Sequence, residues 1–346
     1  LPAVSAGASQ EIWTFEACRA STREALVFRR ARTWSETSQS MSVGMAVEAA
    51  LLRVAAAHGV PVPRVVSEPL EHEGLGQGYV MELVAGETSG QRILRDPVLS
   101  AARPKLLADC AALMARLHVV PADELPPLRD GQARHELLQW ADGYRHNGVA
   151  RPVFELAIQW LEAHLPIPVT PALVHGDFRN GNLVVGPDGV GAVLDWELAH
   201  RGDPMADLGW FCVNAWRFGA VESAAGGFGS REDLFRAYEA TGGQAVDAER
   251  VRFWEVLGNL KRGVTCYAMG LAWRSGEDRS IERLAIARRA SEVEVDLLQL
   301  IAPRHEATVA ATRLDNMARA GLFDSPSRPA SLPEIVRAVR TTVDEA

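Results

Sequence analysis

The chain has 346 residues, 47% hydrophobic and 23% charged, a composition typical of a folded globular protein with a substantial core. Its net charge of −8 and the lack of a long basic run argue against nucleic acid as the main partner, without excluding a local site for a phosphorylated small molecule. No apolar stretch reaches the roughly 18 uncharged residues of a membrane span. The chain starts without Met and shows no signal-peptide pattern, so we expect a trimmed or partial cytoplasmic chain whose four separated cysteines are reduced.

The first quarter of the sequence predicts a small β-rich lobe. Residues 9–33 contain two apolar runs separated by a polar turn, as in a pair of strands. Residues 41–57 have the apolar spacing of a helix, which Gly59 ends. A further strand is expected over 78–84. We therefore place an N-terminal lobe at residues 1–86.

From residue 87 onward helices predominate. Helical patterns cover 104–120, 133–164, 231–241, 248–273 and 279–301. A strand-rich interval at 173–195 interrupts them, and the Gly- and Ala-rich stretch 222–230 is expected to be a mobile loop. The sequence thus predicts an α+β fold of two lobes, with a large α-rich C-lobe over 87–303 that contains a β-hairpin insert.

Residues 304–346 form a separate C-terminal extension. The segment "SLPEIVRAVRTTVDEA" begins with a capping box, Ser331 and Glu334, and continues with an apolar stripe. A short helix of this kind needs a surface to pack on. That surface could belong to the core, to another subunit, or to a partner or domain absent from this chain.

The segment "LVHGDFRNGNLVVGPDGVGAVLDWELAH" (173–200) concentrates polar groups around a predicted hairpin. Pro, Asp and Gly in its centre suit a tight turn between two apolar runs. Pairing about that turn brings Asn182 and Asp195 to the open end, across from each other within a residue or two, where directly opposed side chains are roughly 5 Å apart. Asp177 precedes the first strand and faces the same end. An amide oxygen and a carboxylate so placed are suitable ligands for Mg²⁺.

These residues also resemble a known family. His175-Gly176-Asp177 with Asn182 five residues later resembles the catalytic loop of protein kinases, and Asp195-Trp196-Glu197 takes the place of their D-F-G triplet. Together with "GDPMADLGW" (202–210), the pattern is similar to the aminoglycoside phosphotransferase and choline kinase-like family, including the kinase-like domain fused to some acyl-CoA dehydrogenases. The resemblance covers roughly residues 1–303. It implies a two-lobed protein-kinase-like fold that uses ATP, or another nucleoside triphosphate, and Mg²⁺ to phosphorylate a hydroxyl of a small molecule.

The resemblance implies nucleotide-binding roles in the N-lobe. "SAGASQEIWTF", which contains Ser9, corresponds to the loop whose main chain covers the phosphates. Arg29 takes the place of the phosphate-binding strand lysine, with Arg30 as the alternative, and Glu48 matches the helix glutamate that pairs with that cation. The implied adenine contacts are main-chain groups near Glu82 and Val84.

In the C-lobe the resemblance makes Asp177 the group that accepts the proton of the substrate hydroxyl. Asn182 and Asp195 would hold Mg²⁺, and Arg179 would approach the γ-phosphate. His175 is expected to brace the loop rather than act as a base. The family pattern also implies that Asp207 supports the loop's backbone and that Glu197 lies close to the metal, and we expect the tryptophans of the C-lobe, Trp210 among them, to be core residues.

Two other functional classes remain open at this point. A nucleotide-binding pseudokinase could act as a sensor or scaffold, although such proteins tend to lose one of the three polar residues found here. A metallohydrolase would need further histidine ligands, for which His200 is the nearby candidate. The absence of an A-P-E motif argues against a protein substrate, and the acceptor could be a hydroxy acid or its thioester, an antibiotic, a choline-like alcohol or a sugar.

Overall fold

The computed structural model describes residues 10–19, 22–31, 42–68, 74–146, 148, 150–277 and 279–302. Chain contacts divide the protein into one unit over 1–300 and a second over 301–346, and the description below concerns the first. Residues 5–9 of the predicted nucleotide loop, including Ser9, and the helix expected over 331–346 lie outside the described residues. Both therefore stay predictions.

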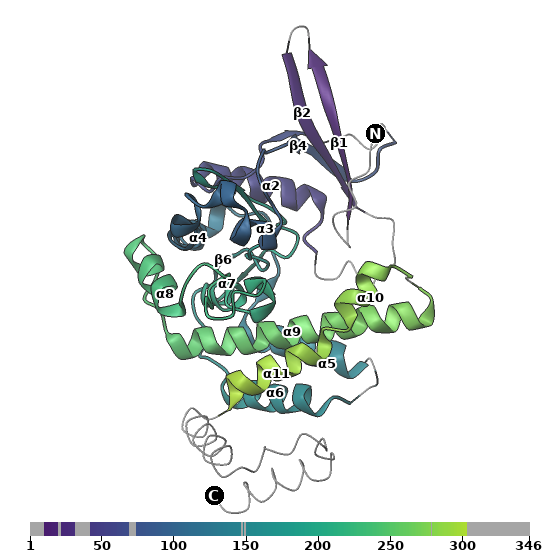
Figure 1. The fold of residues 1–346 in the computed structure, drawn as a ribbon, viewed down its shortest axis with the longest axis vertical. Coiled ribbons are helices and arrows are strands. Elements are labelled where there is room, and N and C mark those ends of the chain that lie inside the picture. The colour runs from purple at the N-terminus through teal and green to yellow at the C-terminus, as the bar shows by residue number, and fades with distance from the viewer. Residues whose placement is uncertain are drawn as a thin grey trace, which may run out of the picture. The chain divides into compact units, whose positions relative to one another are not determined.

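The N-terminal lobe is built on a four-stranded antiparallel sheet in the order β1-β2-β4-β3 (Figure 1). Its elements are β1 (Gln10–Arg19), β2 (Thr22–Ala31), α2 (Met45–Ala57), β3 (Val65–Ser67) and β4 (Gly78–Glu82). Helix α2 packs on β4 with its buried face, which includes Leu51 and Ala55 at the helical spacing read from the sequence. The register pairs Arg29 with Tyr79, so these two side chains lie on the same face of the sheet.

The C-terminal region is helical. Its helices are α3 (Gly90–Arg95), α4 (Arg103–His118), α5 (Ala133–His146), α6 (Pro152–Ala163), α7 (Met205–Phe211), α8 (Arg231–Ala240), α9 (Ala248–Ser275), α10 (Ile281–Ala287) and α11 (Ala290–Ile301). Short 3-10 turns cover Pro97–Leu99, Ala122–Glu124 and Asn214–Arg217. The 28-residue α9 crosses this region and packs against α5, α6, α7 and α10 (Figure 1).

Two small sheets lie among these helices. One is the hairpin of β7 (Leu183–Gly186) and β8 (Gly189–Val193), which turns at the residues expected from the sequence. The other joins β5 (Asp130–Gly131), β9 (His200–Gly202) and β6 (Ala172–Val174). The predicted α+β fold, with a small β-rich N-terminal lobe and a helical C-terminal region, is thereby confirmed. In the part of the chain described, no helix is both long and apolar enough to cross a bilayer.

Two details differ from the sequence predictions. The single helix expected over 279–301 is broken between α10 and α11, because α11 buries Ala290, Val293 and Leu297 whereas α10 buries none of its residues. The stretch 222–230, which was expected to be a mobile loop, is instead packed, with Ala225 fully buried.

The contact between α7 and α9 allows a test of the packing. A Cβ added at Gly209 would lie 2.6 Å from Cβ of Trp254 and 2.8 Å from the backbone N of Glu255. We expect Gly209→Ala to lower the free energy of unfolding in urea by about 1–3 kcal/mol, because α7 must move away from α9. Gly143→Ala, on α5 with no atom within 4 Å of the added Cβ, should instead raise it by about 0.5–1 kcal/mol. Equal stability of the two variants would contradict this packing.

Candidate active site

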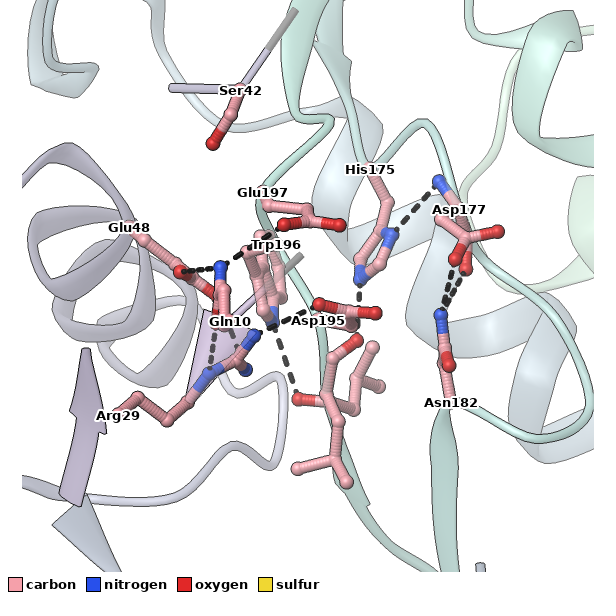
Figure 2. A network of polar contacts seen from close by, with 12 residues as sticks. Gln10, Arg29, Ser42, Glu48, His175, Asp177, Asn182, Asp195, Trp196 and Glu197 are labelled. Atoms are coloured by element: carbon pink, nitrogen blue, oxygen red, sulfur yellow. Dashed lines mark hydrogen bonds and ion pairs between the residues drawn. The ribbon is translucent and has the colours of Figure 1, made fainter. Parts of the chain in front are cut away.

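The hairpin β7–β8 brings the two predicted metal ligands together. Leu183 pairs with Val193, and the N–H of Leu194 donates to the carbonyl of Asn182 at 2.8 Å, so Asp195 follows directly after the last paired residue. Asp195 has a φ of 67°, a left-handed conformation that aspartate tolerates better than most residues. This conformation turns the chain immediately after β8, and the Asp195 carboxylate reaches β2 across the lobe boundary (Figure 2).

Asp177 is held by three side-chain donors. Asn182 Nδ2 donates to its Oδ2 at 2.6 Å, and Trp210 Nε1 donates to its Oδ1 at 2.8 Å. Arg179 Nε lies 3.1 Å from Oδ1 and 3.2 Å from Oδ2. The carboxylate is therefore fixed in orientation before any ligand arrives, which is the state a positioned proton acceptor requires. Trp210 was expected to be a core residue, and its role as a donor to Asp177 was missed.

The backbone of the loop before Asp177 is held by Asp207. The N–H groups of His175 and Gly176 donate to its two carboxylate oxygens at 2.8 and 2.9 Å. The His175 ring accepts from the N–H of Asp177 at 3.2 Å through Nδ1 and donates to the carbonyl of Leu194 at 3.1 Å through Nε2. Burial lowers the pKa of His175, which agrees with this neutral tautomer and with a bracing role.

Asp207 itself is buried among polar partners. Burial raises the pKa of this carboxyl, but the hydrogen bond and the charge of His118, whose Nε2 lies 3.2 Å away, together with His175, leave it below its ordinary value. The other ring nitrogen of His118 forms a hydrogen bond of 2.8 Å with the hydroxyl group of Tyr238. Helices α4, α7 and α8 are thus linked to the loop through one carboxylate.

Arg29 connects the N-terminal lobe with the hairpin (Figure 2). Its guanidinium lies 3.1 Å from Glu48 Oε1 and 2.9 Å from Asp195 Oδ1, and its Nε donates to Gln10 Oε1 at 2.7 Å. The neighbouring Arg30 instead pairs with Glu11 at the more exposed side of the sheet. Of the two arginines that the sequence left as alternatives, Arg29 is the one that faces the hairpin.

Burial and mutual attraction shift the pKa values of both Arg29 and Glu48. Burial alone would lower the pKa of Arg29, but Glu48, Tyr79 and Asp195 raise it well above its ordinary value. Burial raises the pKa of Glu48, and the charge of Arg29 opposes that rise. A charge at either position is consequently stable only while the other is present.

Gln10 is a second residue that the sequence did not reveal. Its amide nitrogen donates to Glu48 at 3.3 Å and to Glu197 at 3.0 Å, while its oxygen accepts from Arg29. One neutral amide therefore ties two carboxylates to one guanidinium. Its only sequence signal is its position inside the segment "SAGASQEIWTF", which was predicted as the nucleotide loop without a role for Gln10.

A cavity of about 390 Å³ lies between the sheet and the hairpin, within the size range of small-molecule sites. Six residues of the predicted site line it: Arg29, Glu82, Val84, Arg179, Asn182 and Asp195. Apolar side chains form much of the remaining wall, including Ile12, Val27, Met81 and Leu194. Such walls suit a flat heterocycle, whereas the polar end suits phosphate groups.

The polar end of the cavity offers a donor set for a hard cation. Asn182 uses its nitrogen on Asp177, so its amide oxygen is the group left for a metal, and the carboxylate of Asp195 is 32% exposed. Mg²⁺ is commonly bound by one or two protein oxygens together with phosphate oxygens and water, and this pair of residues fits that pattern. No group of three His, Cys, Asp or Glu side chains arranged for a metal occurs among the described residues, so the hydrolase alternative finds no support there.

Comparison with known proteins points to one family. The model of the phosphotransferase enzyme family matches residues 2–244. The chain is 34% identical over 176 residues to acyl-CoA dehydrogenase family member 10 of Mus musculus and 33% identical over 170 residues to family member 11 of Homo sapiens. These matches cover 47% and 45% of this chain but only 16% and 21% of the two relatives.

Solved structures with this fold include small-molecule kinases. An aminoglycoside phosphotransferase-like protein of Ralstonia eutropha gives a TM-score of 0.66 at 20% identity, covering 86% of this chain and 91% of the other. A choline/ethanolamine kinase family protein of Mesorhizobium loti gives 0.59 at 20% identity, covering 90% and 92%. An aminoglycoside phosphotransferase in complex with AMP-PNP and hygromycin B gives 0.56 at 16% identity, covering 87% and 93%. At these identities the likeness concerns the fold, and it confirms the two-lobed kinase-like architecture.

A double-mutant cycle tests the pair of Arg29 and Glu48. Arg29→Met leaves a buried carboxylate without its cation, and we expect a loss of about 3–5 kcal/mol in the free energy of unfolding. Adding Glu48→Leu should recover part of that loss, so that the two changes couple by at least about 1 kcal/mol in urea denaturation. Arg30→Met, which breaks only the outer pair with Glu11, should cost about 1 kcal/mol or less. Additive effects of the two buried changes would contradict the pairing.

The pH dependence of stability tests the role of Asp207. Asp207→Asn cannot accept both backbone N–H groups, and we expect it to lower the free energy of unfolding at pH 7 by about 1–3 kcal/mol. Because the pKa of Asp207 is lowered on folding, its contribution is present above the ordinary value of 3.8 and is lost as the pH falls through the folded-state pKa. The difference between wild type and variant, measured by urea unfolding at several pH values, should therefore shrink below about pH 4. A difference that does not depend on pH would argue against an ionised Asp207.

Proposed function

Since this chain belongs to the phosphotransferase enzyme family, we propose that it transfers the γ-phosphoryl group of ATP, or of another nucleoside triphosphate, to the hydroxyl of a small molecule, with Mg²⁺ as cofactor. One observation carries the proposal. Asp177 is fixed by three donors, and one of these, Asn182, lines the same cavity as Asp195 and Arg29. This arrangement supports the proposal because a carboxylate suited to accept a proton, oxygens suited to a cation and an arginine suited to phosphates lie close together.

The nucleotide base fits the apolar part of the cavity. The N–H of Glu82 donates to the carbonyl of Arg64 at 3.0 Å, and that of Leu83 donates to the carbonyl of Ala25 at 2.9 Å. Both N–H groups are therefore used within the lobe. The N–H of Val84 comes next along the chain and is the main-chain donor we assign to the base.

The phosphates would extend from the base toward Arg29 and the hairpin. Glu48 and Gln10 keep the guanidinium of Arg29 directed at the polar end of the cavity, where it can contact phosphate oxygens in a bidentate manner. The oxygens of Asn182 and Asp195 would hold Mg²⁺, which neutralises charge that develops on the transferred group. Glu197, tied to Gln10, would add negative charge near the same place.

Asp177 would orient the acceptor hydroxyl and take its proton. The hydroxyl oxygen would form a bond to the γ-phosphorus while the bond from that phosphorus to the β–γ bridging oxygen breaks, so that the nucleoside diphosphate leaves with the electron pair. Proton acceptance of this kind contributes about 10²–10⁴-fold, and positioning and charge neutralisation supply the remainder. Arg179, bonded to Asp177 and lining the cavity, is placed to stabilise charge on the transferred group.

Nucleotide turnover tests this assignment. We expect Asp177→Asn to lower kcat for ADP release by at least about 100-fold with little change in nucleotide affinity, because only the proton acceptor is removed. Asp195→Ala should abolish turnover that depends on Mg²⁺ and nucleotide while the circular dichroism spectrum stays that of the folded protein. Asp188→Asn, at the exposed turn of the same hairpin, is the matched control and should behave as wild type. Near-normal activity of Asp195→Ala would overturn the metal assignment, and tight Mg-nucleotide binding without turnover of any alcohol would favour a sensor instead.

A further inference from the structure

Two tryptophans and two arginines form a cluster beside Asp177. Trp210, which donates to Asp177, lies 5.2 Å from Trp216 between ring centroids. The guanidinium carbon of Arg179 is 4.4 Å from the centroid of Trp216, and that of Arg262, in the middle of α9, is 5.3 Å from it. Trp216 therefore contacts both Arg262 and Arg179, and Arg179 in turn contacts Asp177.

Among the described residues, Arg262 has no acidic partner of its own. It is partly buried, and within the described part of the chain it forms no ion pair and no hydrogen bond, only the contact with Trp216. Other cations nearby are compensated: Lys261 lies 3.4 Å from Glu136, and Arg217 lies 3.2 Å from Glu255. An uncompensated cation that has lost part of its water is unfavourable, which distinguishes this position from an ordinary surface arginine.

Neighbouring charges make the positive charge of Arg262 still less favourable. Burial lowers the pKa of Arg262, and the positive charges of Arg289 and Arg179 lower it further. Asp177 acts in the opposite direction, but its oxygens already accept bonds from Asn182, Trp210 and Arg179. The cluster thus holds excess positive charge next to the place where the acceptor hydroxyl must lie.

We propose that Arg262, together with Trp216, binds an anionic group, a carboxylate or a phosphate, that the hydroxyl acceptor carries. A guanidinium binds either group through two parallel hydrogen bonds, and the indole ring keeps its plane in place. The acceptor is then a hydroxy acid or a hydroxyalkyl phosphate rather than a neutral or cationic alcohol. This inference rests on the proposed phosphotransferase function, because it concerns the second substrate of the same reaction.

Acceptors that differ only in charge test the proposal. ADP release is measured at saturating Mg-ATP with 3-hydroxybutyrate, 1,3-butanediol and 4-amino-2-butanol, which share one carbon skeleton, and with glycerol 3-phosphate against glycerol. We expect the anionic member to have at least about a 10-fold higher kcat/KM than its neutral partner in one series, which identifies the carboxylate or the phosphate as the group bound. A neutral or cationic member that is the better acceptor overturns the proposal. So does the failure of every anionic member to accelerate ADP release.

Variants on α9 separate a binding role from a structural one. Arg262→Gln should reduce the preference for the anionic member about 10-fold or more, mainly through KM, and Arg262→Lys should restore part of it. Arg274→Gln removes another arginine of α9 that lies over an aromatic ring, Tyr267 at 5.8 Å, and should keep the full preference. An unchanged preference in Arg262→Gln overturns the assignment.

If the wild type releases no ADP and binds no Mg-AMP-PNP, the phosphotransferase proposal itself fails, whereas slow ADP release without acceptor preference rejects only the anionic acceptor.

Discussion

The ion pair between Arg29 and Glu48 is the interaction on which the arrangement of the site depends. Both side chains are buried, and each is stable in its charged form only because the other is present. Arg29 also contacts Asp195, which ends the hairpin of the C-terminal region. The guanidinium of Arg29 therefore fixes the distance between the sheet and the hairpin, which form the two walls of the cavity.

The charges of this network are unequal. Arg29 contacts two carboxylates, those of Glu48 and Asp195, and Gln10 bonds to Arg29 and Glu48 without adding charge. Such a group retains excess negative charge, which favours the arrival of a cation before or together with the phosphates. On the other side of Asp177 the excess is positive, at Arg179 and Arg262. Asp177, which we propose as the proton acceptor, contacts both Asn182 of the hairpin and Arg179.

The sequence predicted the parts of the site that depend on local pairing or on a family pattern. Asn182 and Asp195 came together because a hairpin with a defined turn leaves little freedom in register. Trp210 and Gln10 were missed because a donor that reaches a carboxylate through tertiary packing has no signature in its own neighbourhood. The break between α10 and α11 was missed for a similar reason, since a helix follows the surface available to it as well as its own periodicity.

The difference between local strand pairing and tertiary packing also explains why the acceptor is harder to infer from the sequence than the nucleotide. The groups we assign to the phosphates lie on β2, α2 and the hairpin, where geometry is fixed by strand register and a short loop. Trp216 and Arg262 belong instead to a 3-10 turn and to the middle of α9, and no spacing in the sequence relates them. Their association arises only when α9 packs against α7, which carries Trp210. A change in the residues that α9 presents at this point would alter acceptor choice without disturbing Asp177, which is how one phosphoryl-transfer scaffold can serve acceptors of different charge.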